Sequence, residues 1–338
     1  MTDTALPSGH RSRAIAIGGS TGALPVVRDI LRDLPTPVAA PIFVALHTGS
    51  GGRNILAEAL QNTSARPVVT AMDGHLAEDD TVYVAPADNH LLVIDGCLRL
   101  GGGPRENLAR PAIDPLLRSV GACYGGGAIG VVLSGKLNDG AAGLADLKRC
   151  GGITVVQSPA DAVAGEMPLG ALDASAVDHR GPAENLGEIL ARLLEEQPGP
   201  DAAIPDAVFL EIDIALGRPC LTQDIATFAD PVALSCPSCG GVLSQVRTPP
   251  LRFRCQVGHA FTADILAQEQ EGSLDEAVRV ALRIVEERAQ LVDRLARDSE
   301  GAGRAHSARD FARKAQELRE HADVLRRAAL KETRQMRS

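Results

Sequence analysis

Short apolar runs alternate with segments of helical period over residues 13–197. The apolar runs predict buried strands at residues 13–18, 40–46, 67–72, 81–85, 128–133 and 153–157. The helical segments lie at residues 22–34, 54–60, 112–122, 140–150 and 186–196. A hairpin is predicted over residues 90–100, where Asp95-Gly96 offers a tight turn. Strands that alternate with helices predict an α/β domain, with a mainly parallel, doubly wound sheet covered on both faces.

The pattern changes after residue 197. The run Pro198-Gly-Pro-Asp201 is typical of a linker, and residues 198–232 mix short apolar stretches with Pro and Gly, so we assign that range to the linker. Residues 233–262 are rich in Cys and His and predict a small zinc-ribbon-like module. The sequence therefore predicts an α/β domain, a linker, a metal module and a helical tail.

The tail, residues 273–331, carries apolar side chains at helical spacing on both sides of Gly301-Ala-Gly303. In its second segment the apolar positions form an unbroken heptad seam. The tail is therefore predicted to be an antiparallel helical hairpin. Its seam can be covered within the hairpin, in a coiled-coil dimer, or by docking on a partner. The apolar positions are Leu274, Val278, Ala281, Val285, Val292 and Leu295, then Ala308, Phe311, Ala315, Leu318, Ala322, Leu325 and Ala329.

Composition and charge exclude several classes of protein. The chain has 338 residues, 45% of them hydrophobic, which is enough to bury a real core. Its 34 basic and 43 acidic side chains leave a net charge of −9, and it has no Trp and only two Tyr. General nucleic-acid binding is therefore not expected. No run is long enough for a membrane span, and residues 1–12 lack the apolar core of a signal peptide, so we expect a cytoplasmic protein without membrane insertion.

Gly18-Gly-Ser20-Thr-Gly22 fits the G-x-S-x-G pattern between a predicted strand and a predicted helix. Such a turn exposes the serine hydroxyl at the carboxyl edge of the sheet, where a helix N-terminus favours developing negative charge. The motif therefore indicates a nucleophilic Ser20. A glycine turn that only packs helix on strand, or that binds a phosphate, has the same pattern. Dinucleotide binding is a weaker interpretation, because the second half of G-x-G-x-x-G is missing.

A serine nucleophile needs a base and an orienting carboxylate. His47 directly follows the second predicted strand, and Asp139 follows the strand at residues 128–133, so both would emerge at the edge that carries Ser20. Spacing alone leaves Asp114 and Asp73 open as the carboxylate, and a lone Asp is often only a turn or cap residue.

With these motifs the chain resembles the catalytic domain of the chemotaxis protein-glutamate methylesterases, the CheB type. The resemblance covers residues 13 to about 195. It is carried by residues 15–22, the strand ending at His47, residues 82–86 with Asp88 and His90, residues 110–114, residues 138–143, and Met167-Pro168.

The resemblance implies a CheB-like fold and a serine hydrolase that removes methyl esters from glutamate side chains of methyl-accepting chemotaxis receptors. Some members also deamidate receptor glutamines. Residue by residue, Ser20 matches the nucleophile, His47 the base and Asp139 the orienting carboxylate. Thr21 lies beside the nucleophile, the backbone amide of Lys136 matches a proposed oxyanion donor, and Arg110 lies in a segment that lines the cleft. No cofactor is expected for this reaction.

Several residues depart from the family pattern. Leu46, Thr48 and Gly49 replace a Gln before the histidine and a Met-Pro after it. Lys136 and Leu137 stand where the family usually has Met and Gly, and Glu166 stands where it usually has Gly. About a dozen residues precede the first predicted strand, so control through a fused receiver domain is not expected.

The Cys/His module carries a second chemical signal. Cys236 and Cys239 form a Cys-x2-Cys pair, and Cys255 and His259 form a Cys-x3-His pair. Four soft ligands suit tetrahedral zinc and leave no open position, so we predict a structural metal. Free thiols in a reducing cytoplasm are the plain alternative. Nucleic-acid binding is the usual rival for a zinc ribbon, but Phe253 and Phe261 are better explained as its small core.

The sequence leaves two other functions open. The altered Lys136-Leu137 pair would also suit a signalling scaffold that has kept the fold and lost turnover. A hydrolase of a small ester or amide would carry the same catalytic groups.

Overall fold

A computed structural model describes residues 13–47, 55–200 and 202–335, with side chains up to residue 329. Residues 1–12, and residues 48–54 with Thr48, Gly49 and Asn54, lie outside the described residues. The chain divides into two compact units, Met1–Leu266 and Ala267–Ser338, which we describe separately. None of the described helices is long and apolar enough to cross a membrane.

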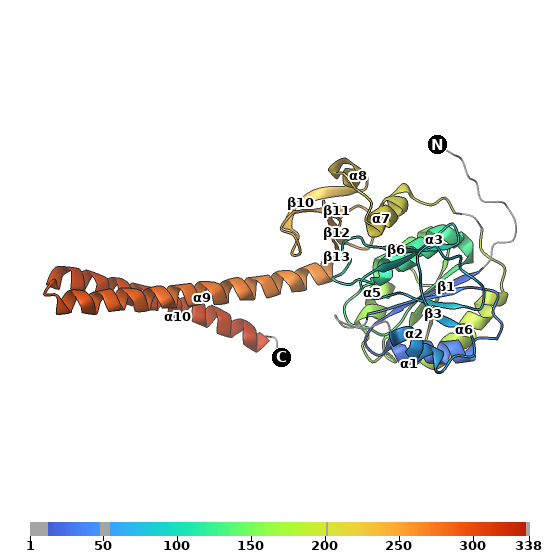
Figure 1. Ribbon diagram of the computed structural model, residues 1–338, viewed down its shortest axis with the longest axis horizontal. Helices are drawn as coiled ribbons and strands as arrows, with labels where there is room; N and C mark the ends of the chain where they lie inside the picture. Colours follow the sequence, from blue (N-terminus) through green and yellow to red (C-terminus); the bar gives the residue numbers. More distant parts are fainter. Residues whose placement is uncertain (1–12, 48–54, 201, 336–338) are drawn as a thin grey trace. The chain divides into compact units, whose positions relative to one another are not determined.

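A parallel sheet forms the centre of the first unit (Figure 1). Within the described residues it has seven strands in the order β3-β4-β2-β1-β7-β8-β9, and every neighbouring pair is parallel. The strands are β1 (Ala14–Gly19), β2 (Ile42–Leu46), β3 (Val68–Thr70), β4 (Val82–Val84), β7 (Ala128–Val132), β8 (Ile153–Gln157) and β9 (His179–Gly181). The predicted fold class is confirmed, and the short β9 is a strand that the hydrophobic pattern missed.

Helices cover both faces of this sheet. One face packs against α1 (Ala23–Asp33), α2 (Ile55–Gln61) and α6 (Ala183–Glu195). The other face packs against α3 (Ile113–Tyr124), α4 (Ala141–Arg149) and α5 (Glu166–Ala174), together with the hairpin of β5 (His90–Ile94) and β6 (Cys97–Gly101). A 3-10 turn, η1 (Gly125–Gly127), leads from α3 into β7.

Strand β1 shows why its sequence forms a central strand. Successive side chains of a strand point to opposite faces. Ile15 and Ile17 therefore enter the core beneath α1, whereas Ala14 and Ala16 enter the core beneath α3. The α3 side is closely packed: a Cβ added to Gly18 would lie 2.1 Å from Ile113 Cγ2. Small residues on that side of β1 let α3 approach the strand end where Ser20 follows.

Residues 198–232 are more structured than a linker. They contain α7 (Asp206–Leu216), α8 (Thr222–Ala226) and the beginning of β10 (Ala229–Ser235). Helix α7 buries Val208, Ile212 and Ala215 against Leu92 of β5. The linker prediction was therefore wrong for most of this range, because Pro and Gly at its ends concealed a helix whose apolar side packs on the α/β domain.

The Cys/His module is a four-stranded antiparallel sheet in the order β10-β11-β12-β13 (Figure 1). The other strands are β11 (Val242–Val246), β12 (Arg252–Cys255) and β13 (Ala260–Thr262). Phe253 and Phe261 are buried in its core, as predicted. The module belongs to the same compact unit as the parallel sheet.

The tail forms two long helices, α9 (Ala263–Gly301) and α10 (Ala305–Gln335), joined at Gly303, whose φ is 74°. The hairpin is as predicted, but α9 begins at Ala263 and not at residue 273. In α10 the seam residues Ala315 and Ala322 are buried. In α9 the buried positions beyond its first turn are Ala289, Val292, Ala296 and Ser299, whereas Leu274 and Leu295 are 55% and 41% exposed. The apolar positions that the sequence gives for the first helix therefore coincide only in part with the side chains that the structure buries.

Candidate active site

Ser20 lies in the sharp turn between β1 and α1. Its amide donates to Ser134 O at 2.9 Å, and its carbonyl accepts from Ala23 N at 3.0 Å, which begins the helix. Gly22 has φ of 83°, and a Cβ there would lie 2.5 Å from Val163 Cβ, so only glycine suits this position. The strand–turn–helix setting that the motif requires is present.

His47 follows β2 at the same edge. Its backbone amide donates to Gly19 O at 3.1 Å, and the parallel register pairs Gly19 with Leu46. The next position on each strand is Ser20 and His47, so the two residues are neighbours at the carboxyl edge. Among the described residues no hydrogen bond joins the Ser20 hydroxyl to the His47 ring. Such bonds are often long without substrate.

Asp139 is the carboxylate that contacts His47. Its Oδ2 lies 2.7 Å from His47 Nε2 and accepts a second hydrogen bond from Ile113 N at 2.7 Å. Its Oδ1 accepts from Asn107 Nδ2 at 3.0 Å and from the amides of Gly140 and Asp114 at 3.0 and 3.3 Å. Asp73 instead accepts from Leu100 N. Of the three candidate carboxylates, Asp139 is therefore the one that contacts His47.

Two buried carboxyls lie side by side at this site, and their pKa values move apart. Burial by itself raises the pKa of Asp139, but the hydrogen bond and charge of His47, with the donors from Ile113 and Asn107, hold it below its ordinary value. Burial and the charge of Asp139 raise the pKa of Asp114 to about 8. Near neutral pH the pair therefore carries one charge, on the residue that faces His47.

The loop before Asp139 presents a candidate oxyanion donor. The amides on either side of Lys136 are engaged: Gly135 N donates to Ala164 O, and Leu137 N donates to Glu166 Oε2, both at 2.9 Å. In the described part of the chain the Lys136 amide has no protein acceptor. Gly135 of the same loop lies against Ser20, since an added Cβ would be 3.0 Å from Ser20 Cβ.

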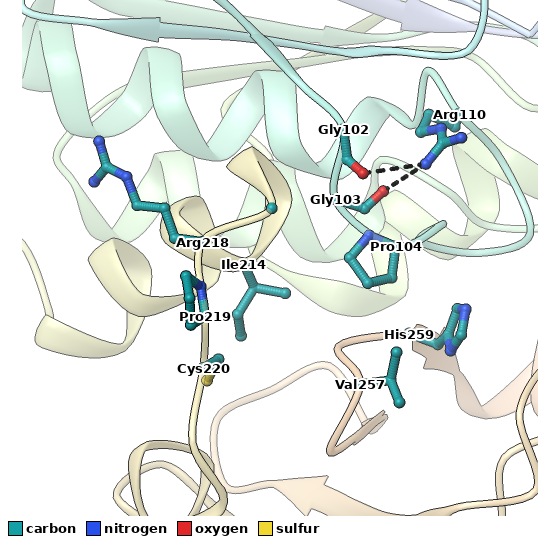
Figure 2. A pocket seen from close by; sticks show the side chains of 11 residues that line it. Gly102, Gly103, Pro104, Arg110, Ile214, Arg218, Pro219, Cys220, Val257 and His259 are labelled. Carbon is teal, nitrogen blue, oxygen red and sulfur yellow. Dashed lines mark hydrogen bonds between the residues drawn. The ribbon is translucent and has the colours of Figure 1, made fainter.

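Thr21 and Arg110 flank these groups. Thr21 is exposed, and its carbonyl accepts from Ser134 Oγ at 2.7 Å. Arg110 is held by Asp88 at 2.8 Å and by the carbonyls of Gly102 and Gly103 (Figure 2). It borders a cavity of about 280 Å³ beside the histidine, lined by His47, Arg105, Asn107, Leu108, Ala109, Arg110 and Pro111.

A second cavity of about 420 Å³ shares Arg110 and reaches His259 of the module (Figure 2). Its wall is formed by the Gly102–Pro104 turn, the segment after α7 with Arg218 and Cys220, and Val257. Arg110 thus stands between the cavity beside His47 and the cavity beside the Cys/His module.

A comparison with protein-family models decides the family. The model described as CheB methylesterase matches residues 15–190, which is more than half of the chain. The chain belongs to the CheB methylesterase family.

Individual relatives agree with this assignment. The chain is 38% identical over 180 residues to protein-glutamate methylesterase/protein-glutamine glutaminase 3 of Anaeromyxobacter dehalogenans, covering 51% of each chain. It is 36% identical over 182 residues to the protein-glutamate methylesterase FrzG of Myxococcus xanthus, covering 54% of each. The chain thus spans about half the length of these curated relatives.

Among solved structures, the chain is similar to the CheB methylesterase catalytic domain of Thermotoga maritima. The identity is 31% and the TM-score 0.51, and the match covers 54% of this chain and 98% of that one. The matched part is the α/β domain, as the family model places it.

Three departures from the CheB pattern lie together. Leu137, where the family usually has Gly, has φ of 63°, a left-handed conformation that glycine adopts without strain. Glu166, also in place of a Gly, accepts the hydrogen bond of the Leu137 amide. Lys136, which precedes Leu137, is exposed. One substituted residue, Glu166, therefore holds the backbone of another, Leu137.

Asn107 is a site residue that the sequence analysis missed. It is buried, and its side-chain amide donates both to Asp139 and to Asp114, at 3.0 and 2.8 Å. Its Oδ1 accepts from Thr262 N of β13 at 3.0 Å. No local pattern points to it: the contact with Asp139 spans 32 positions and that with Thr262 spans 155.

The four predicted metal ligands are brought together. The ligand atoms of Cys236, Cys239, Cys255 and His259 all lie within 4.8 Å of one another. Cys239 Sγ lies 3.7 Å from Cys255 Sγ, and His259 Nδ1 lies 3.5 and 3.9 Å from the sulfurs of Cys255 and Cys236. Ligands about 2.0–2.3 Å from a tetrahedral zinc ion stand roughly 3.5–3.8 Å apart, so these spacings suit zinc.

Proposed function

We propose that this protein is a serine esterase that hydrolyses γ-glutamyl methyl esters on the cytoplasmic helices of methyl-accepting chemotaxis receptors. The observation that carries the proposal is the bond of 2.7 Å between His47 Nε2 and buried Asp139, beside the strand end that bears Ser20. Membership of the CheB methylesterase family supports the reaction class. The same groups would also suit hydrolysis of a receptor glutamine amide, since the name of one relative includes protein-glutamine glutaminase.

In the proposed reaction, His47 takes the Ser20 proton on Nδ1 as the hydroxyl oxygen attacks the ester carbonyl. Asp139 holds the ring through Nε2 and stabilises the positive charge that forms on it. The Lys136 amide faces no protein acceptor and would donate to the developing oxyanion. Methanol leaves with the proton from His47. Water, activated by the same histidine, then releases the glutamate side chain and restores Ser20.

We propose that the cavity beside His47 receives the substrate segment. Arg105 is exposed and Arg110 is partly exposed at its border. The Arg105 guanidinium next to the triad, with Arg110 whose charge is shared with Asp88, would favour a segment with further carboxylates around the ester. This supports an acidic receptor helix over a neutral small ester.

We propose that the Cys/His module binds one structural zinc ion through Cys236, Cys239, Cys255 and His259. Four protein ligands leave no open position, so the ion would supply folding energy to the module and no step of the hydrolysis. Metal analysis of the purified chain tests this. We expect one zinc ion per wild-type chain. The comparison variant is Cys239→Ser, which should have lost the zinc ion.

We propose that the helical hairpin is a contact surface for a second copy of the chain or for a partner. Besides its seam, α9 exposes Val280, Ile284, Leu291 and Leu295, whose spacing places them along one side of the helix. Covering them in a dimer or on a partner would remove apolar surface from water. Light scattering on the full chain and on Ile284→Glu with Leu291→Glu distinguishes a dimer from a monomer.

Methanol release from a methylated receptor cytoplasmic fragment tests the main proposal. We expect release by the wild-type chain and none by Ser20→Ala, while Thr248→Val, in a turn of the module, should match wild type. A scaffold without turnover is the second candidate, because Leu137 places a left-handed non-glycine residue in the oxyanion loop. No release, together with no labelling of Ser20 by a fluorophosphonate probe, would favour the scaffold.

A further inference from the structure

We propose that the Cys/His module is a working part of the esterase active site: Thr262 of β13 positions Asn107 and Asn138, and through them Asp139 and the oxyanion loop. This inference rests on the proposed serine-hydrolase function. It makes the esterase depend on a metal that takes no part in its chemistry. The argument starts at Asp139 and moves outward to the module.

The first link runs through Asn107. Its side-chain nitrogen donates to Asp139 Oδ1, the carboxylate oxygen that His47 leaves free. Two further polar groups of Asn107 are held by β13: its backbone amide donates to Ala260 O at 2.8 Å, and its Oδ1 accepts from Thr262 N. Because the module occupies the amide oxygen, the side-chain nitrogen must face Asp139 and Asp114. Thr262 thus sets the orientation of the one side-chain amide that donates to Asp139 among the described residues.

The second link runs through Asn138, the residue before Asp139. Its Oδ1 accepts a hydrogen bond from Thr262 Oγ1, and its Nδ2 donates to Asp264 Oδ2 at 2.7 Å. Both partners come from the end of the module, at β13 and the first turn of α9. One threonine therefore contacts both loops that border the triad, with its backbone amide on one and its hydroxyl on the other.

Both loops contain backbone that needs such support. Asn107, Leu108 and Leu137 have φ of 51°, 65° and 63°, a region that bulky residues rarely adopt. The side chains of Leu108 and Leu137 pack against the module core around Phe253 and Phe261. A strained conformation persists only where its surroundings hold it. Here the surroundings are the module, including at Leu137 in the oxyanion loop.

The predicted metal site fixes the strands that make these contacts. β12 ends at the ligand Cys255, and β13 begins directly after the ligand His259. On β12, Arg254 donates to Glu106, the neighbour of Asn107, at 3.0 Å. A bound metal would lock the turn between the two strands, and its loss would free β13 from Asn107 and Asn138.

Substitutions on the full, zinc-loaded chain test the positioning role. Asn107→Ala removes the bridging amide, Thr262→Val removes the hydroxyl and keeps the N–H, and Thr248→Val is a matched control in the same module. The rate of Ser20 labelling by a fluorophosphonate probe should fall about 100-fold in Asn107→Ala and about tenfold in Thr262→Val, in line with the cost of small misplacements. The control should be unchanged.

A spectroscopic readout separates positioning from a general loss of stability. The proton in a short His–carboxylate hydrogen bond is expected far downfield in the NMR spectrum, so the 2.7 Å contact between His47 and Asp139 should give such a signal. We expect it to be lost or broadened in Asn107→Ala, with zinc content and unfolding cooperativity retained. Full labelling and an unshifted signal in both variants would overturn the proposal.

Zinc removal by a chelator tests the metal link on the wild-type chain. Amide hydrogen exchange should rise at residues 106–110 and 134–139, stay slow in β1 and α1, and slow again at both loops when zinc is restored. Unchanged exchange at these loops in zinc-free protein would contradict the proposal. The fluorophosphonate probe reacts with Ser20 without a receptor. Normal labelling of Ser20 together with no methanol release would therefore contradict the proposed substrate and leave the positioning proposal intact. If the probe does not label Ser20 of the zinc-loaded wild type, the esterase proposal fails. The NMR signal and the hydrogen exchange then still test whether the module positions Asn107 and Asn138.

Discussion

The parallel sheet and the boundary between the α/β domain and the Cys/His module are both buried, yet opposite kinds of side chains hold them. The sheet packs through aliphatic residues such as Ile15, Ile17 and Val131. The boundary also has a few apolar contacts, but its centre is an ionic cluster, in which no side chain is more than 4% exposed. Its members are Arg118, Arg252 and Arg254 with Glu106, Asp146 and Glu211.

The two regions differ in how they set position. Apolar packing is non-directional and tolerates small changes of shape. A buried ion pair adds little net stability over apolar residues of the same volume, but each partner becomes costly to remove. Charged hydrogen bonds are also directional, so they can fix the register of β12 against the segment with Glu106 and Asn107. The contrast explains how an appended module can reach into an active site with fixed geometry.

The largest effect is expected at the sheet edge itself. Asp139→Asn should keep the fold but lower kcat for methanol release by about 10⁴-fold, because an amide presents the wrong hydrogen-bond pattern to His47. The variant is compared with wild type by methanol release, and its fold by circular dichroism. A loss of less than tenfold would mean that the His47–Asp139 bond has no catalytic role.

The ionic boundary should show the next effect. Burial by itself raises the pKa of Glu211, but Arg118, Arg252 and Arg254 hold it well below its ordinary value. Glu211→Gln leaves these buried guanidiniums underpaired and should lower the unfolding free energy by about 3–5 kcal/mol. Urea unfolding measures the loss.

The matched control is Glu287→Gln, which breaks an exposed pair with Arg283 and should have little effect. Because the folded pKa of Glu211 is lowered, its contribution is present above the ordinary value of 4.5 and lost as the pH falls below it. Equal losses in the two variants would show that burial gives the boundary no special role.

The buried pair at the active site predicts a dependence of stability on pH. Burial and the charge of Asp139 raise the folded pKa of Asp114 from 3.8 to about 8. Its stabilising contribution is therefore full below pH 3.8 and is lost as the pH rises through about 8. Over this range the unfolding free energy of wild type should fall, relative to Asp114→Asn, by at most about 1.4 kcal/mol per pH unit. Parallel curves for the two proteins would contradict the pKa shift.

The smallest effect is expected in the apolar core. Ile17→Val removes one methylene from a fully buried site on β1 and should cost about 1 kcal/mol. Methanol release should stay near the wild-type level, because the backbone before Ser20 is unchanged. A loss as large as that of Glu211→Gln would remove the contrast between the two regions.

Much of the α/β domain was predictable because its signals are local. A run such as residues 128–133 is apolar throughout, since both faces of a central parallel strand are buried. Ser20, His47 and Asp139 could be named as candidates because each follows such a strand, and parallel strands end at one edge. The Cys and His spacings similarly indicated which residues would meet in the module. Spacing alone left Asp114 and Asp73 open as the carboxylate; the family resemblance pointed to Asp139, and the structure shows that Asp139 is the one in contact with His47.

The sequence by itself predicted most strands of the parallel sheet, the order of the candidate catalytic groups along the chain and the candidate metal ligands, because each leaves a pattern over a few residues. Only the tertiary structure decided that α7 is not a linker, that Asn107 bridges two carboxyls, and that β13 lies against the active-site loops. These contacts join positions such as Glu106 and Arg254, which are 148 residues apart. Hydrophobic periodicity carries no record of such pairs, since which buried charge meets which depends on how whole elements pack.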